Sequence, residues 1–275
     1  MARVVLKEPG TISIPRDVKP TSATVTITRD RDSSAVVTAQ ACTVEAERVF
    51  YVLAAQTSIA NLTAVFTIVD ARGTSTLSIP VEVVSGRVCS IADCRRLAPL
   101  DDANRYPDEL ILGAITGVEV ALEDACGVSF VGREVTGLHD GNGTFELFLR
   151  ASRPQSITSV TVAGVALATD EFNALVVDVE GGVLIKTGHW QIGRRNVMVT
   201  GVFGLSTVPG MVANAAALAV RQALVSSRVD PRAVSVTNED GTTAMLVTAG
   251  VRGAVFSLPE MNQVVAQYRT TFGVA

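Results

Sequence analysis

Two histidines and four cysteines are the residues of this chain with the widest chemical range. His139 lies beside an Asp-Gly-Asn-Gly turn, His189 follows Gly188, and Cys126 closes the apolar face of an expected helix. A hydrolase needs a nucleophile, a base and an oxyanion site. The sequence contains no nucleophile elbow, HExxH motif or P-loop. Because histidines at turns are mostly exposed surface residues and cysteines on helix faces mostly buried ones, we expect no enzyme and no catalytic residue.

Candidate metal ligands are spaced poorly for any metal. Asp140, Asn142 and Thr144 alternate as in a calcium loop, but Phe145 and Ala151 occupy the positions of the required glycine and glutamate. The cysteines lack the paired CxxC spacing of a zinc site; they are Cys42, Cys89, Cys94 and Cys126. The remaining candidates are acidic residues of the kind commonly found at a helix start, namely Asp101, Asp102, Asp108 and Glu109. We expect no metal, no cofactor, and reduced thiols that are mostly buried.

The charge of the chain argues against tight binding of nucleic acid. The net charge is −4, only 18% of the residues are charged, and the arginines are dispersed without interleaved aromatic residues. A surface that only faces DNA is still compatible with this pattern, and its candidates are Arg133, Arg150 and Arg153. The most apolar stretch is interrupted by Arg221, and no secretory signal opens the sequence, so we expect no membrane partner.

Residues 1–86 favour β-structure throughout. Short runs rich in Val, Thr and Ile alternate with turn residues, as in ATVTITRD, SSAVVTAQ, RVFYVLAA, LTAVFTIVD and STLSIPVEVV. Strands at this spacing without intervening helices predict an all-β sandwich of immunoglobulin-like shape over residues 1–86.

Residues 87–228 predict helices on both sides of a β-meander. IADCRRLAPL is a short helical candidate, and Pro107 opens a longer helix that stops at Gly127. Its apolar face comprises Ile111, Ala114, Ile115, Val118, Ala121, Leu122 and Ala125. From Phe130 to Leu205 the pattern predicts strands, with hairpin turns at 140–143 and 181–182. An alanine-rich helix is then expected from Ser206 or Thr207 to about Ser227.

Residues 229–275 predict an extended arm followed by a short helix. SLPE, from Ser257 to Glu260, is typical of a capping box, and MNQVVAQYRTTF follows it. The predicted fold class is therefore α+β: an N-terminal all-β sandwich, a helical core with an inserted β-meander, and a C-terminal arm with a terminal helix.

The order of these elements resembles the head-to-tail connector, or adaptor, proteins of long-tailed double-stranded DNA bacteriophages. The resemblance covers about residues 91–269 and lies in the succession of several loose motifs. These are PDELILGAITGVEVALEDACG, SRPQSITSVTVAGVAL, WQIGRRNVMVTGVFG, an alanine-rich helix after Val-Pro, and SLPE before VVAQYR. Residues 1–86 lie outside it and form an added domain.

The resemblance implies a non-enzymatic virion protein. Members of this family form a ring, usually dodecameric, between the portal protein and the next neck or tail protein. Such a ring extends the DNA channel without binding DNA specifically. Its implied location is the virion neck at the portal vertex, with assembly in the host cytoplasm.

The resemblance also suggests which residues contact neighbouring subunits or the portal: Trp190, Arg194, Arg195, Leu258, Met261, Val265 and Tyr268. For Trp190 we expect an anchor at the start of a strand or at a subunit contact, because large aromatic side chains dominate both settings. The two arginines following it are expected to pair with a neighbour's carboxylates or to face the channel.

Three alternatives remain at this point. A tail terminator or stopper of the same neck differs only in its partner. A surface-binding protein would use the immunoglobulin-like domain, although the aromatic residues of that domain are only Phe50, Tyr51 and Phe66. An enzyme that uses Cys126 or a histidine ranks last.

Overall fold

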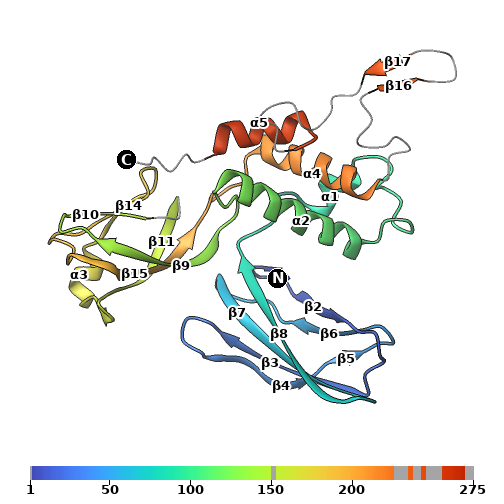
Figure 1. Ribbon diagram of the computed structural model, residues 1–275, viewed down its shortest axis with the longest axis horizontal. Helices are drawn as coiled ribbons and strands as arrows, with labels where there is room; N and C mark the ends of the chain where they lie inside the picture. Colours follow the sequence, from blue (N-terminus) through green and yellow to red (C-terminus); the bar gives the residue numbers. More distant parts are fainter. Residues whose placement is uncertain (1, 150–152, 226–234, 238–242, 246–255, 270–275) are drawn as a thin grey trace. The chain divides into compact units, whose positions relative to one another are not determined.

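A computed structural model describes residues 2–149, 153–225, 235–237, 243–245 and 256–269 of the chain. The fold is mixed α+β, as the sequence predicts, with several separate sheets (Figure 1). Two compact units make up the chain: Met1–Gly86 together with Val131–Ser206, and Arg87–Phe130 together with Thr207–Ala275. The expected division into domains 1–86, 87–228 and 229–275 differs from this grouping and stays a prediction.

The N-terminal part of the first unit consists of two sheets. The larger has the strand order β1 (Ala2–Val5), β8 (Gly73–Val84), β7 (Ala60–Asp70), β3 (Ser22–Arg29) and β4 (Ala35–Ala41). The smaller has the order β2 (Gly10–Pro15), β6 (Arg48–Leu53) and β5 (Thr43–Val44). All five strands expected from the sequence are present. β1 and β8 pair in parallel, whereas the other strand pairs described in these two sheets are antiparallel.

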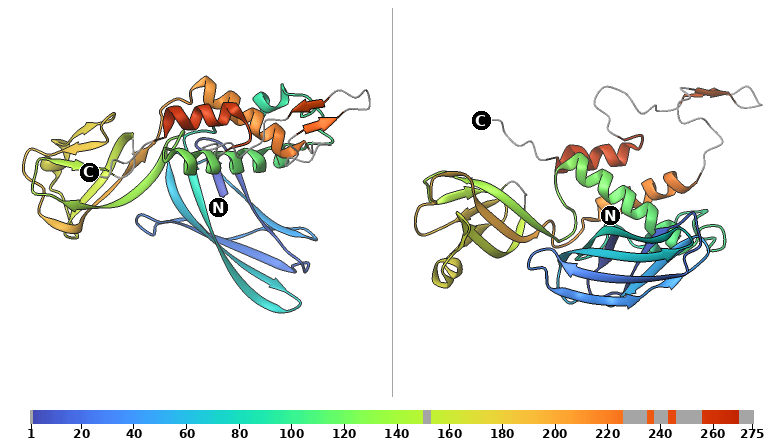
Figure 2. Two further views of the ribbon diagram at one scale, coloured as in Figure 1. Left: turned by 45° about the horizontal axis from the view of Figure 1, so that its top comes forward. Right: turned by 60° about the horizontal axis from the view of Figure 1, so that its bottom comes forward.

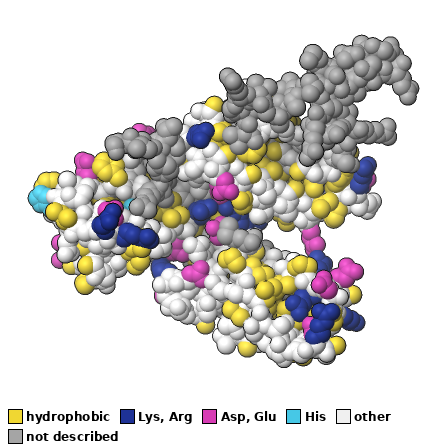
Figure 3. Space-filling view, viewed as in Figure 1, with side chains coloured by type: hydrophobic (Ala, Val, Ile, Leu, Met, Phe, Trp, Pro, Cys, Tyr) yellow, Lys and Arg dark blue, Asp and Glu magenta, His cyan; other side chains and the backbone are white. Residues whose placement is uncertain are grey.

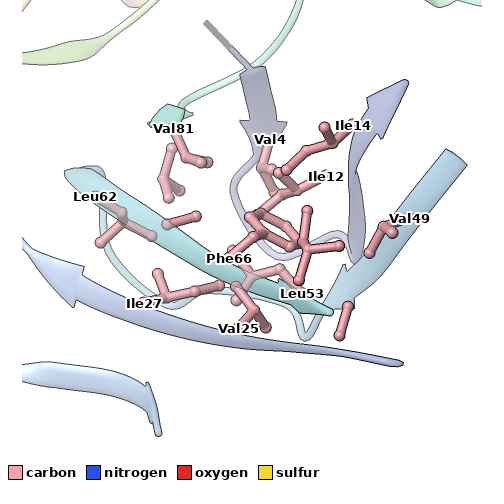
Figure 4. Packing of buried hydrophobic residues seen from close by; sticks show 14 of the residues in the cluster. Val4, Ile12, Ile14, Val25, Ile27, Val49, Leu53, Leu62, Phe66 and Val81 are labelled. Carbon is pink, nitrogen blue, oxygen red and sulfur yellow. The ribbon is translucent and has the colours of Figure 1, made fainter. Parts of the chain in front are cut away.

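The two N-terminal sheets share one apolar core. Every second residue of β7 is buried, as alternation in a half-buried strand requires. Figure 4 shows Phe66 of β7 in the middle of this core, with Ile12 and Leu53 from the smaller sheet close to Val25 from the larger one. Truncating a fully buried phenylalanine typically costs about 3–5 kcal/mol, so Phe66 contributes strongly to the stability of this core.

The meander that completes the first unit also has two sheets. One has the order β12 (Val165–Ala166), β11 (Pro154–Val162), β15 (Gly193–Phe203) and β9 (Arg133–Gly141). The other has the order β10 (Glu146–Phe148), β14 (Val183–Ile185) and β13 (Val176–Asp178), and the short helix α3 (Thr169–Asn173) precedes β13. Leu147, Leu184, Val197 and Val199 contribute to a shared core around Trp190.

Hydrogen bonds link the meander to the N-terminal sheets within the first unit. The backbone N–H of Asn61 donates to Glu134 Oε2 (2.9 Å), and its side-chain Nδ2 donates to the Glu134 carbonyl (3.0 Å). The backbone N–H of Ser85 donates to the Gly132 carbonyl (2.8 Å). Glu134 is buried, so these bonds satisfy groups that would otherwise be costly to remove from water.

The second unit is helical. It contains α1 (Ile91–Arg95), α2 (Asp108–Cys126), α4 (Gly210–Leu224), α5 (Pro259–Tyr268) and a small antiparallel sheet of β16 (Ser235–Thr237) and β17 (Thr243–Met245). Helices α2, α4 and α5 lie side by side (Figures 1 and 2). Within the described residues, none of these helices has both the length and the apolar character of a membrane span.

Local signals explain where these helices begin and end. Pro107 precedes α2, and Gly127 adopts the left-handed conformation (φ 68°) at its end, both as predicted. Helix α1, where Ser90 and Asp93 form a reciprocal capping box, is also confirmed. Helix α4 ends at Leu224, before the expected Ser227, because the backbone is already extended at the next residue.

Two expectations about local structure are wrong. The turn at 140–143 does not make a hairpin, because β9 pairs with β15 whereas β10 pairs with β14. Ser257 does not start a capping box: Leu258 is the N-cap of α5, and the Ser257 hydroxyl donates to Gln222 Oε1 (3.2 Å). Instead Asn262 holds this segment, since its side chain bonds both the N–H and the carbonyl of Phe256.

Candidate functional site

The segment from Gly188 to Gly210 contains Trp190, Arg194 and Arg195, three of the residues that the sequence singles out. Its tryptophan belongs to the core. Trp190 is 1% exposed, its Nε1–H donates to the Phe145 carbonyl (3.0 Å), and its backbone N–H donates to the Thr144 carbonyl (2.8 Å). Lys186 Nζ lies 5.7 Å from the centre of the indole. The expected role as an anchor at the start of a strand fits this position. The expected subunit contact does not, because the ring offers almost no surface to a partner.

A bulge in β15 follows the tryptophan and presents an exposed loop. The β9–β15 register shifts between Gly193 and Val197, so residues 194–196 oppose a single residue of β9. Arg195 adopts a left-handed conformation (φ 48°), and its N–H donates to Asp140 Oδ1 (2.5 Å). The backbone of this loop is therefore held in one shape.

One asparagine fixes both ends of this bulge. Asn196 Oδ1 accepts from the Gly141 N–H (2.8 Å), and Asn196 Nδ2 donates to the Gln191 carbonyl (2.8 Å). The side chains of Ile192, Arg194 and Arg195 are exposed, and none of the three forms an ion pair or ring contact among the described residues. Ile192 and Asn196 were not predicted. The signal for Ile192 was a large apolar residue in a loop between Gly188 and Gly193.

Of the four contact residues predicted at the terminal helix, two are buried within the second unit and two are half-buried. Met261 and Val265 are buried, since α5 packs on α2 and α4 of its own chain. Their assignment to an interface with another subunit is therefore wrong for the described chain. Leu258 and Tyr268 are half-buried, and the Tyr268 ring meets the Phe130 ring edge-on at 5.4 Å.

The arginines expected to face DNA are Arg133, Arg150 and Arg153. Arg133 and the residue after Arg153, Pro154, both pair with Phe203 of β15, so Arg133 and Arg153 lie at the same end of this sheet. Arg133 is half-buried at the start of β9, and Arg153 is exposed with a left-handed backbone (φ 59°). Arg150 lies outside the described residues. Figure 3 shows Lys and Arg side chains scattered among Asp and Glu, without a broad basic area on the face in view.

The residues with catalytic potential differ in their surroundings. Cys89 and Cys94 are both buried, and their Sγ atoms lie 3.9 Å apart. His139 is buried in β9, so its expected surface position is wrong, whereas His189 is exposed and stacks on Phe145 (4.2 Å). Cys126 is buried as expected, and burial raises the pKa of its thiol to about 11. Within the described part of the chain, no three His, Cys, Asp or Glu residues are grouped as metal ligands. The expectation that the chain is not an enzyme stays a prediction.

Two buried glutamates of α2 were missed by the sequence analysis. Glu119 accepts hydrogen bonds from the Val88 N–H and from Arg87 Nη1, each at 2.9 Å. Glu123 accepts from the Ser129 hydroxyl (2.8 Å). Both glutamates lie on the same face of the helix as the buried Ile111 and Ile115. Their helical spacing from these residues could have predicted that they are buried. They attach the segments that flank α2 to the helix.

Comparison with known proteins identifies no family for this chain. No protein-family model and no curated protein matches the chain. A solved structure of the neck of an empty gene transfer agent (GTA) particle, computed with C6 symmetry, contains a similar chain. The two are 16% identical with a TM-score of 0.42, over 68% of this chain and 92% of that one. At this TM-score the likeness carries no argument about fold or function.

Proposed function

We propose that the chain is a structural protein of a bacteriophage neck: a head-to-tail connector that forms a dodecameric ring between the portal and the next neck or tail protein. The observation that carries the proposal is the order of elements over residues 91–269. The long helix α2, the two-sheet meander, the alanine-rich α4 and the short α5 follow one another as in the resemblance described above.

The packing of the second unit supports a scaffold role. Ala215, Ala216 and Ala217 of α4 are buried, and such small side chains let helices approach closely. The Arg95 guanidinium donates to the carbonyls of Leu100 (2.6 Å) and Tyr106 (2.7 Å), which fixes the loop before α2. The polar groups of this unit thus bind its own backbone and stiffen it.

The charge of the chain supports a channel that DNA passes through without being held. Protein surfaces that bind phosphates tightly carry a clustered excess of Lys and Arg. This chain carries 23 basic and 27 acidic residues. A weakly charged lumen would let DNA slide during packaging and ejection.

The N-terminal sandwich is proposed to be an immunoglobulin-like domain added to the connector. Two sheets around one core support this assignment. The hydrogen bonds of Asn61 and Ser85 to the meander support a fixed attachment of this domain to the connector.

The proposal is tested by mixing the purified full chain with the portal protein encoded in the same genome. The expected result is a ring that sediments with the portal. A chain that stays monomeric and does not bind the portal would contradict the proposal, and rings that bind tail tubes but not the portal would favour a tail terminator.

A further inference from the structure

The small sheet of the meander has apolar residues on both faces. Strand pairing places Glu146 and Phe148 of β10, Val183 and Ile185 of β14, and Val176 and Asp178 of β13 on one face, called here the outer face. The intervening residues, Leu147, Leu184 and Val177, point to the core around Trp190. Four of the six residues of the outer face are therefore apolar.

Two of the four apolar residues of this outer face are exposed in the single chain, whereas Val183 is 8% exposed and Ile185 is half-buried. Phe148 is 65% exposed and Val176 is 59% exposed. An antiparallel sheet that faces water on one side normally has polar residues there. Exposed apolar patches with polar rims mark interaction sites on soluble proteins. The outer face is therefore expected to be covered in the assembled protein.

The outer face is also acidic. Glu146 and Asp178 stand at its two diagonal corners, and neither carboxylate forms an ion pair among the residues that the structure describes. Lys186, which follows β14, pairs with Glu171 (3.4 Å) and lies over the Trp190 ring instead. A partner for this face should therefore be apolar with positive charge beside it.

The exposed loop of β15 has this complementary composition. Ile192 is 79% exposed, and the cationic Arg194 and Arg195 follow it closely. The β-bulge and the bonds of Asn196 fix the backbone of the loop, so little conformational entropy is lost when it docks. One chain thus carries both an apolar acidic surface and an apolar basic loop.

We propose that the outer face of one copy receives the Ile192–Arg195 loop of the next copy. This contact is heterologous, because the two surfaces are different, and a heterologous contact that closes on itself makes a ring. The apolar contact is between Ile192 and the Phe148–Val176 area, and the two arginines pair with the carboxylates at the corners. The inference rests on the proposed function, because it assigns the contact between subunits of the connector ring.

Charge reversal on the two surfaces provides a direct test. The Arg194→Glu variant would set a carboxylate of the loop against the carboxylates of the outer face, and the Glu146→Arg variant would set a guanidinium of the outer face against the arginines of the loop. Each variant alone is expected to need at least about tenfold higher protein concentration to assemble, because like charges in contact oppose association. In an equimolar mixture, the loop of each variant can contact the outer face of the other variant. These contacts join opposite charges at positions 194 and 146, so assembly is expected to recover.

Matched controls separate this contact from general effects of charge and hydrophobicity. Arg72→Glu reverses an exposed arginine on the N-terminal sheets, and Val52→Ser removes an exposed valine there. Both are expected to assemble like the unmodified chain, whereas Ile192→Ser is expected to assemble poorly. Trp190 fluorescence checks that each variant keeps the fold of the meander.

Sedimentation velocity, alone and with the portal protein, distinguishes the outcomes. Recovery in the mixture but not in either variant supports the contact. If the unmodified chain makes rings and the Arg194→Glu and Glu146→Arg variants do so equally well, or if the mixture does not recover, the contact is refuted and the connector function stands. If the unmodified chain makes no ring and binds no portal, both proposals fail.

Discussion

Replacing Glu119 with alanine should destabilise the helical unit strongly. The carboxylate is 1% exposed and accepts from the buried Val88 N–H and from the Arg87 guanidinium. Leaving a buried N–H without an acceptor costs about 1–3 kcal/mol. Breaking a buried ion pair costs about 3–5 kcal/mol in total, because the remaining charge loses its partner. We therefore expect Glu119→Ala to lower the free energy of unfolding by about 3–5 kcal/mol.

Urea unfolding followed by far-ultraviolet circular dichroism measures this loss. The Glu119→Gln variant keeps an oxygen for the Val88 N–H but loses the charge opposite Arg87, so its loss should be smaller. Asp124 is exposed on the same helix, and Asp124→Ala should change the stability by no more than about 0.5 kcal/mol. A loss below about 1 kcal/mol for Glu119→Ala would refute the assigned role of the carboxylate.

Three further predictions concern core packing, pH and thiol reactivity. Trp190→Phe should cost about 1–3 kcal/mol in urea unfolding, because the core loses volume and the carbonyl of Phe145 keeps only the Lys186 N–H of its two donors; an unchanged midpoint would contradict this. Hydrogen bonds from Ser90 lower the pKa of Asp93, so its contribution to stability should be present above 3.8 and lost as pH falls below that value. The stability difference between the unmodified chain and Asp93→Asn should therefore shrink as the pH falls from above 3.8 through the lowered pKa of Asp93, and a difference that does not change with pH would refute the capping role. Burial raises the pKa of both Cys42 and Cys126 to about 11, and only Cys42 is partly exposed. Mass spectrometry after alkylation should therefore find Cys42 modified first and Cys126 modified only in urea.

The sequence predicts those elements whose signals are local. Pro107 and Gly127 delimit α2 because proline and a left-handed glycine act on the backbone where they stand. The Gly181–Gly182 pair makes the β13–β14 hairpin for the same reason. Alternation over β7 predicts a strand with one buried side, and this strand lies in the middle of the larger sheet.

The sequence does not predict features that depend on distant partners. Glu119 is buried because Arg87 and Val88 come from outside the helix, so its charge suggested a solvent-facing position. The turn at 140–143 failed as a hairpin because β9 and β10 each find a better partner in a later strand. Trp190 was assigned a possible contact with another subunit, but the core that encloses it is assembled from both sheets of the meander.

The same limit applies to the candidate site. The arginine pair was found by residue type, whereas Ile192 and the opposing apolar face of β10, β13 and β14 became visible only with the strand register. Phe148 and Leu147 are adjacent apolar residues, and alternation in a strand sends one to the core and the other to solvent. Which of the two faces inward is decided by tertiary packing.

Electron microscopy of the purified chain mixed with the portal protein of the same genome tests the connector function most directly. The account predicts a symmetric ring of about twelve copies, seated on the portal around an open channel. Monomers beside unoccupied portals would contradict it.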